Sequence, residues 1–317
     1  MNEYNALVEG AALLERADAG LLILTDADRH DFLHRMTTNQ INKLAPGKAT
    51  VTVLTNPTAR MLCVFTVLVR ADELWLLPAA GQTAALERHL RGQIFFMDKV
   101  KVRNASETLR RCRLMGPKAE AVLANAGFAV TTLADEHWLE QNEHVILRQT
   151  TFDLPGYELI APEAHYQRLL TSLIDAGATV LHDENAYESR RIELGRPAAG
   201  HELTDAYNPL EAGIGWACSD NKGCYTGQEI IARQITYDKI TKSLVGLRSE
   251  QLLPVGTELS EGGRVVGVVT SAASNPGSQA PLALAIVKRP YNAAGTTLTM
   301  DHQTVEVVAL PFSTATL

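Results

Sequence analysis

The sequence predicts an α+β protein with two α/β units followed by an all-β barrel. Apolar strands separated by short turns lead into an amphipathic helix twice, over residues 49–92 and 148–177. A shift of 83 residues places Leu76, Leu77, Leu86 and Leu90 on Leu159, Ile160, Leu169 and Leu173. This match indicates either an internal duplication or two unrelated amphipathic units. From Thr241 onward, short β-rich segments alternate with Gly, Pro and Ser, as in small barrels.

The elements can be justified in chain order. Runs rich in Val, Ile, Leu and Thr predict strands at 20–25, 49–55, 61–69 and 73–78. A helix over 28–40 would place Phe32, Leu33 and Met36 on one face, and a second over 81–92 ends at a glycine. In the second unit, two strands flank a Pro-Gly turn within 148–162, and a helix follows over 163–177.

Length and composition narrow the class of protein. The 317 residues suffice for two or three domains, and 46% hydrophobic with 21% charged residues is ordinary for a globular chain. The net charge of −7 argues against a DNA-coating protein. No apolar run reaches the ~18 residues of a membrane span. The acidic N-terminal segment is unlike a signal or transit peptide, and the four cysteines form no CxxC pair, so we expect a cytoplasmic protein.

The segment NKGCYTGQEIIARQ carries the strongest local signal for chemistry. Thr226 and Glu229 fit a capping box and predict a helix start, while Gly223 and Gly227 permit tight turns before it. Cys224 would lie near the positive end of that helix and two residues from Lys222, which favours the thiolate. The alternative is that Cys224 is a small apolar residue beneath a structural turn.

A second signal lies upstream, where a helix is expected to begin near Asp183. Arg191 and Glu193 come just before Gly195 and Pro197, which would end the helix. A carboxylate in this position could accept paired N–H donors from a heterocycle. An ordinary solvated Arg/Glu face is the alternative.

These segments together resemble one known family. The string KGCYTGQE (222–229) follows RIELGRP (191–197), HELT (201–204) and NPLEAG (208–213). Near the N-terminus, HDFLHRMTTNQINKL and LTNPTARMLCVFTVL resemble the family's helical segment and hairpin. The chain thus resembles the YgfZ branch of the glycine-cleavage T-protein superfamily, which comprises folate-binding proteins of iron–sulfur cluster maintenance.

The resemblance implies two ferredoxin-like α/β domains and a C-terminal β-barrel around a central hole that binds tetrahydrofolate. The implied domains are 1–110, joined by 185–240, then 111–184, and the barrel over 241–317. The segment 185–240 carries the folate and KGCYTGQE motifs. Glu193 is expected to hold the pterin, and the other implied folate-binding residues are Arg191, Glu211 and Arg233. The implied functional loop has Cys224 and Lys222 as its catalytic candidates, together with Gly223, Tyr225, Gly227, Gln228 and Glu229.

One departure from the family bears on the reaction. Aminomethyltransferases of the superfamily carry two acids in the hairpin, and Cys63 and Val64 stand at those positions here. Without a carboxylate, aminomethyl transfer lacks its general acid/base. We therefore expect a folate-binding chain that does not cleave glycine.

Two further features are weaker. Residues 99–118 hold seven Lys and Arg residues against one acid and are a candidate RNA or acidic-partner contact, with a solvated sheet edge as the alternative. His30 and His34 share a helix spacing but have no third ligand nearby, so no metal site is predicted.

Three functions follow from these observations. The first is a folate-dependent accessory protein for the assembly or repair of iron–sulfur enzymes, including tRNA-modifying ones, with such enzymes or cluster-assembly proteins as partners. The second is a folate-dependent one-carbon, aminomethyl-type transferase. The third is an RNA- or protein-binding adaptor without chemistry.

Overall fold

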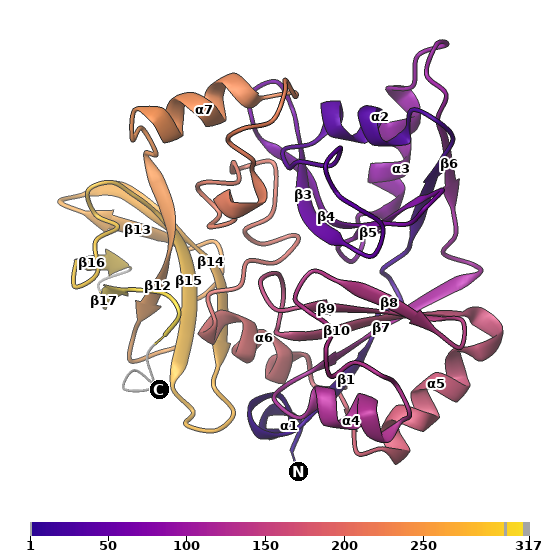
Figure 1. Cartoon of the computed structure of the whole chain (residues 1–317). Helices are drawn as coiled ribbons and strands as arrows, with labels where there is room; N and C mark the ends of the chain where they lie inside the picture. Colours follow the sequence, from indigo (N-terminus) through magenta and orange to yellow (C-terminus); the bar gives the residue numbers. More distant parts are fainter. Residues whose placement is uncertain (1, 301–302, 313–317) are drawn as a thin grey trace.

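A computed structural model describes residues 2–300 and 303–312 of the chain. Two mixed α/β units and a closed barrel surround a connecting segment, as Figure 1 shows. The predicted class, a T-protein-like fold of two α/β units and a C-terminal barrel, is therefore confirmed.

The first unit is a five-stranded sheet with the order β3-β4-β5-β2-β6. Its strands are β2 (Leu22–Thr25), β3 (Ala49–Thr55), β4 (Met61–Val69), β5 (Leu74–Pro78) and β6 (Lys101–Asn104). Helices α2 (Arg29–Met36) and α3 (Thr83–Gly92) cover one face, and their apolar sides join Phe65 and Val67 in a shared core. The predicted strands at 49–55 and 61–69 match β3 and β4.

The second unit repeats this plan. It runs β7 (Leu109–Met115), α4 (Ala119–Asn125), β8 (Trp138–Gln141), β9 (His144–Gln149), β10 (Gly156–Pro162), α5 (Glu163–Asp175) and β11 (Thr179–Val180). Its order β8-β9-β10-β7 corresponds to β3-β4-β5-β2 of the first sheet. Shared strand order and helix positions support the duplication that the 83-residue shift suggested.

The N-terminus departs from the predicted domain boundary. Residues 1–110 were expected to form the first domain, yet β1 (Ala12–Glu15) lies in the second sheet between β7 and β11. There Ala12 and Leu13 bury their side chains, and α1 (Glu3–Glu9) packs against α6 (Glu184–Glu193). A four-residue strand is not stable alone, and hydrogen bonding to β7 and β11 on both sides stabilises it.

The two sheets pack face to face and carry their helices on the outer sides. Ile23, Leu68 and Trp75 of the first sheet contact Leu147 and Ile160 of the second. The inner face of β4 also presents Thr66, which accepts a hydrogen bond from Gln149 of β9 at 3.0 Å. The helix–sheet–sheet–helix stack thus brings equivalent strands of the two units together.

The barrel has the order β12-β15-β14-β13-β16-β17. Its strands are β12 (Lys242–Arg248), β13 (Glu258–Glu261), β14 (Arg264–Ser274), β15 (Pro281–Lys288), β16 (Thr297–Met300) and β17 (Gln303–Val308). Before it come α6 (Glu184–Glu193), the 3-10 turn η1 (Gly215–Ala217) and α7 (Gln228–Thr236). Helix α6 packs on β14 and β15, so this segment joins the barrel to the sheets.

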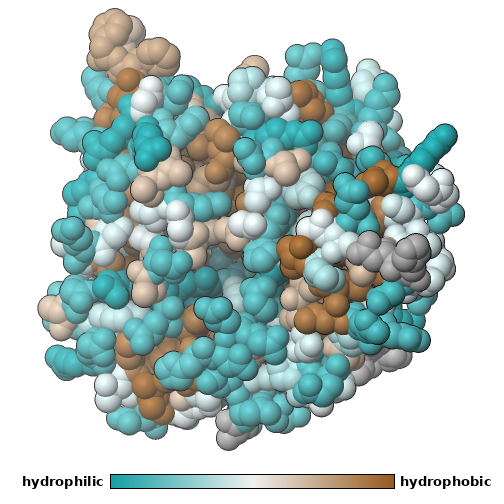
Figure 2. All heavy atoms as spheres, turned by 180° about the vertical axis from the view of Figure 1, so that it is seen from behind, coloured by the Kyte–Doolittle hydropathy of each residue, from teal (hydrophilic) through white to brown (hydrophobic). Residues whose placement is uncertain are grey.

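The surface is largely polar. Figure 2 shows a mainly hydrophilic face with apolar side chains standing out at one upper corner. The loop between α3 and β6 exposes Phe95, Phe96 and Met97. Within the described ranges, we find no helix with the length and apolarity that a membrane crossing requires.

Candidate functional site

A cavity of about 230 Å³ lies where the two sheets meet α6 and the connecting segment. The first sheet contributes Thr66, Leu77 and Pro78, and the second contributes charged side chains from β7 and β10. Residues 196–203 close the side toward the barrel. This is the central position that the sequence predicted for a ligand.

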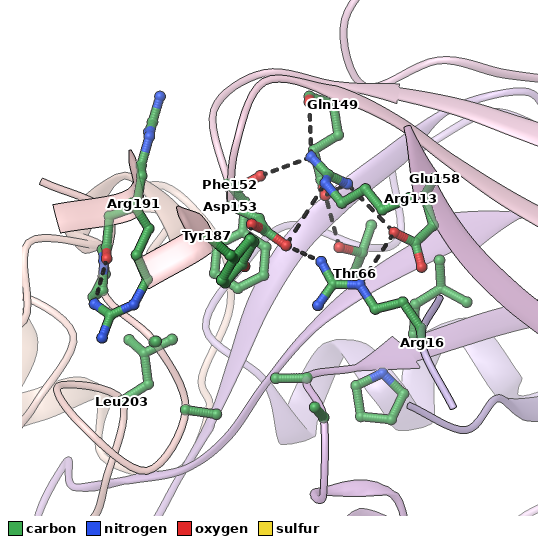
Figure 3. Close-up of a pocket in the computed structure, with 18 of the residues that line it drawn as sticks. Arg16, Thr66, Arg113, Gln149, Phe152, Asp153, Glu158, Tyr187, Arg191 and Leu203 are labelled. Carbon is green, nitrogen blue, oxygen red and sulfur yellow. Dashed lines mark hydrogen bonds and ion pairs between the residues drawn. The ribbon is translucent and has the colours of Figure 1, made fainter. Parts of the chain in front are cut away.

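Five charged residues form a buried network along the second sheet. Glu158 of β10 accepts from Arg111 Nε at 2.7 Å and lies 3.4 Å from Arg113 Nη1. Asp153 pairs with Arg16 and lies 3.6 Å from Arg113 Nε. Figure 3 shows Arg16, Arg113, Asp153 and Glu158 turned toward one another at the cavity.

The network determines the ionisation of its carboxyl groups. Burial alone would raise the pKa of Asp153, but the guanidinium groups of Arg16 and Arg113 outweigh burial and hold the pKa at about 2. The pKa of Glu158 is likewise lowered by its arginines against the effect of burial. Both carboxylates are therefore charged throughout the physiological pH range.

The cavity nevertheless retains unused donors. Arg16, Arg113 and Arg196 each have a buried Nε with no hydrogen-bond partner in the described part of the chain. Five arginines and three acids line the cavity, so arginine is in excess. An electron-rich ligand with several acceptor atoms would satisfy these N–H groups.

Helix α6 forms the opposite wall. Arg191 is 1% exposed, donates to Glu188 through Nε at 2.8 Å and reaches Ser271 Oγ at 2.8 Å. Arg191 lines the cavity, and its role in folate binding stays a prediction. Glu188 also lines the cavity, and a carboxylate retains acceptor sites beyond those that one guanidinium occupies.

The structure does not bring Glu193 to this cavity. Its carboxylate is 1% exposed and accepts from Tyr4 and Asn275, with Arg190 Nη1 at 2.8 Å. One helical turn and a half separates it from Glu188, so the two acids lie on different sides of α6. Glu193 ties α1 and the barrel to α6, whereas Glu188 lines the central cavity.

Two other predicted folate ligands lie elsewhere. Glu211 is buried beside Arg60, with Nη1 at 2.9 Å, and accepts from the backbone N–H of Asn208. Arg233 lies on the exposed face of α7 and pairs with Glu229 at 2.7 Å. Neither lines the central cavity. Both residues are close in sequence to the 222–229 motif, but this closeness does not place them at the central cavity.

Lys222 has a structural role here. Its Nζ donates to the carbonyl groups of His34, at 2.5 Å, of Thr37, and of Asn39, at 2.8 Å. These carbonyls lie at the C-terminal end of α2, where they lack helical partners. Burial lowers the pKa of Lys222 to about 7. These hydrogen bonds anchor the loop to the first unit.

The capping box predicted at Thr226 and Glu229 is wrong. Helix α7 begins one residue later, after Gly227, whose φ is +85°. A Cβ at this position would lie within 3 Å of the Asn56 carbonyl oxygen and of Ala59 Cα. The carbonyl of Thr226 accepts from Thr55 Oγ1 at 2.6 Å. Glycine is required here because a Cβ would collide with the 56–59 turn.

Cys224 is exposed, whereas Cys63 and Cys112 are buried and Cys218 is partly buried. Burial raises the pKa of the thiols of Cys63 and Cys112, and that of Cys218 to about 12. In the same loop, Tyr225 is buried against Ala59 and Ile231, and Gln228 reaches the Lys222 carbonyl at 3.5 Å. Tyr225 and Gln228 are thus held by contacts within the protein, whereas the Cys224 thiol stays accessible.

The hairpin positions also have defined places. Val64 lies on the inner face of β4 in an apolar cluster with Leu203, which lines the cavity. Cys63 faces the opposite core, with Sγ 3.1 Å from Gln82 Oε1. An acidic side chain at position 64 would thus lie next to the cavity. Because this chain has valine there, that carboxylate is absent.

The basic stretch over 99–118 is not one surface. Arg111 and Arg113 are buried in the ionic network, and Lys101 pairs with Asp26 at 3.2 Å. Its contact with RNA or an acidic partner stays a prediction. His34, one of the two paired histidines, accepts from Ile41 N at 3.2 Å through Nδ1.

Sequence reasoning missed the cavity's most polar wall. Arg16, Asp153 and Glu158 come from three separate segments, and Glu158 reads as an ordinary solvent position within YELIA. The one available signal was the alternation in RRCRL, which places Arg111 and Arg113 on one face of a strand.

Comparison with known families agrees with this architecture. The model of the GCVT N-terminal domain matches residues 1–222, and that of the glycine cleavage T-protein C-terminal barrel domain matches residues 242–313. The chain therefore belongs to the glycine-cleavage T-protein family.

Individual relatives are more distant. A chloroplastic protein of Arabidopsis thaliana named as a transferase is 27% identical over 96% of this chain and 72% of its own length. An aminomethyltransferase of Bacillus subtilis is 26% identical over 98% of this chain and 90% of its own length. The crystal structure of aminomethyltransferase T of Bartonella henselae superposes with a TM-score of 0.89 at 24% identity, covering 98% of this chain and 88% of that one. This likeness shows a common fold.

Proposed function

We propose that this chain binds a reduced folate in its central cavity and acts as an accessory protein for iron–sulfur enzymes, including tRNA-modifying ones. The observation that carries the folate part is the cavity itself. Nε–H groups of Arg16, Arg113 and Arg196 that have no hydrogen-bond partner in the described part of the chain meet an apolar wall where the two sheets adjoin α6.

The cavity fits the ring end of a folate. A complete drug-sized ligand needs roughly 300–1,000 Å³, so about 230 Å³ admits the bicyclic pterin and leaves the tail to extend outward. Glu188 can accept the adjacent ring N–H groups, and Leu77, Pro78 and Phe152 supply apolar contacts. The arginine excess suits the oxygen of the ring and the anionic tail.

A lack of aminomethyl transfer is supported at the inner face of β4. Val64 occupies the cavity-adjacent position where aminomethyltransferases of the superfamily have an acid. Position 64 therefore supplies no carboxylate as a general acid or base. The accessory role is supported by the motif around Cys224 and by the exposure of its thiol.

Tetrahydrofolate titration by calorimetry tests the folate site. Glu188→Gln should weaken binding ten- to a hundredfold, since a charge-assisted hydrogen bond contributes about 1.5–3 kcal/mol. Glu193→Gln is the matched control, because it changes the same charge on the same helix outside the cavity. If Glu193→Gln weakened tetrahydrofolate binding more than Glu188→Gln, Glu193 would be the residue that holds the pterin. No binding by the wild-type chain would refute the proposal.

Aminomethyl transfer is the second candidate, favoured by similarity to proteins of that name over nearly the whole chain. Reconstitution with the other glycine-cleavage components distinguishes the two. We expect no turnover, and in a cell lacking its own copy we expect Cys224→Ser to impair iron–sulfur enzymes. Turnover comparable to that of a genuine aminomethyltransferase would favour the second candidate.

A further inference from the structure

A second cavity, of about 360 Å³, lies on the other side of α6. It is bounded by α1, by the turn after β7 and by the start of β10. Tyr187, Glu188 and Arg191 of α6 face the central cavity, whereas Arg190 and Leu194 face this one. The two cavities share the helix but no lining residue.

The second cavity has an apolar interior. Its apolar lining comes mainly from Leu7, Val8, Met115, Leu154 and Leu194. Its volume is within the range of small-molecule sites, which combine such walls with a few polar groups that orient the ligand.

Two arginines supply the polar groups. Arg148 donates through Nη1 to the Leu133 carbonyl at 2.9 Å, and the same atom lies 3.7 Å from Glu120. Arg190 uses its Nη1 for Glu193. No described residue accepts from the Nε or Nη2 of either guanidinium, so each keeps donors for a planar acceptor such as a carboxylate.

We infer that this cavity is a binding site for a small amphipathic carboxylate. The apolar body packs against Val8 and Leu194, and the carboxylate accepts from Arg148 and Arg190. Glu120 is the one acid in the described lining, and Tyr157 Oη donates to it at 3.1 Å. The acid weakens an anionic ligand and does not affect a neutral one. The site is independent of the proposed folate cavity.

Calorimetry with straight-chain carboxylates from butanoate to octanoate tests the ligand class. Affinity should rise about fourfold for each added methylene, as expected for burial of a CH₂ group. The alcohol of equal length should bind at least tenfold more weakly, because it cannot accept a charge-assisted pair. Affinity that ignores chain length, or equal affinity for acid and alcohol, would overturn the proposal.

Variants locate the site. Val8→Glu places a carboxylate in the lining and should weaken octanoate binding at least tenfold, whereas Asn5→Glu adds the same charge on the exposed side of α1 and should not. Glu120→Gln should tighten octanoate and leave octanol unchanged. Saturating tetrahydrofolate should not displace octanoate. Equal effects of the two α1 variants, or displacement by folate, would place the binding elsewhere.

Discussion

The two α/β units share one topology and contribute opposite walls to the central cavity. The first presents Thr66, Leu77 and Pro78, which are small or apolar. The second presents Arg111, Arg113 and Glu158 on the strands that correspond to β2 and β5. Since strand pairing needs only the buried periodicity, the cavity-facing positions of the two copies could diverge. The second unit therefore lines the cavity with charged side chains, and the first lines it with small or apolar ones.

The largest effect is expected from Glu158→Gln in the charged copy. The carboxylate is 2% exposed and balances Arg111 and Arg113, so its loss leaves buried cations uncompensated. We expect a loss of about 3–5 kcal/mol in the free energy of unfolding, measured in urea. Glu229→Gln removes an exposed pair and should cost less than about 1 kcal/mol. Equal losses would show that the network is dispensable.

The same network predicts acid sensitivity. The native pKa values of Asp153 and Glu158 lie below their ordinary values. Their stabilising contribution is therefore complete above the unfolded pKa values near 4 and declines as the pH falls toward 2. Glu158→Gln should flatten the decrease of unfolding free energy between pH 5 and pH 2, as followed by circular dichroism. An unchanged slope would contradict this cause.

Val64→Asp tests whether position 64, in the first α/β unit, is desolvated. Val64 is 1% exposed among Leu203, Tyr207 and Ile214, so the new carboxyl group would be desolvated. We expect a loss of about 1–3 kcal/mol at pH 5, where burial keeps the acid neutral. The loss should grow toward pH 8, because the unfolded chain ionises the group that the folded chain keeps protonated. Val64→Thr is the neutral control, and a pH-independent loss would mean that the position is solvated.

The sequence predicted the buried strands and helices of both units, but it did not predict the charged wall of the cavity. Strand periodicity predicted β3, β4 and the repeated helices, because buried apolar faces leave a local pattern. The network of Arg16, Asp153 and Glu158 left none, because each residue is brought in by a different strand or loop. The motif at 222–229 was identified, but whether Lys222 pointed at Cys224 or at α2 depended on a contact nearly 190 residues away in sequence.

Lys222→Met tests the anchor between the motif and the first unit. Three carbonyl groups at the end of α2 lose their donor, which should cost about 1–3 kcal/mol. Because the folded pKa is about 7, the unfolded chain binds more protons up to its ordinary value near 10.4. The wild type should therefore gain stability from pH 7 to pH 9, and the variant should lack that gain in urea titrations. If the free energy of unfolding of the wild type and of the variant changed with pH in the same way, Lys222 would not be the anchor.

The smallest effect on stability is expected two residues further on. The Cys224 side chain is exposed, so Cys224→Ser should change the free energy of unfolding by less than about 0.5 kcal/mol. Of the four thiols in the described part of the chain, that of Cys224 alone is exposed. Cys224 should therefore be alkylated first in the native protein, while Cys63, Cys112 and Cys218 react after unfolding, as peptide mass analysis can follow. Native labelling spread evenly over all four would contradict the fold around the loop. If the serine variant keeps wild-type stability and folate affinity yet fails to support iron–sulfur enzymes in cells, the defect belongs to the sulfur itself, because no structural change remains to explain it.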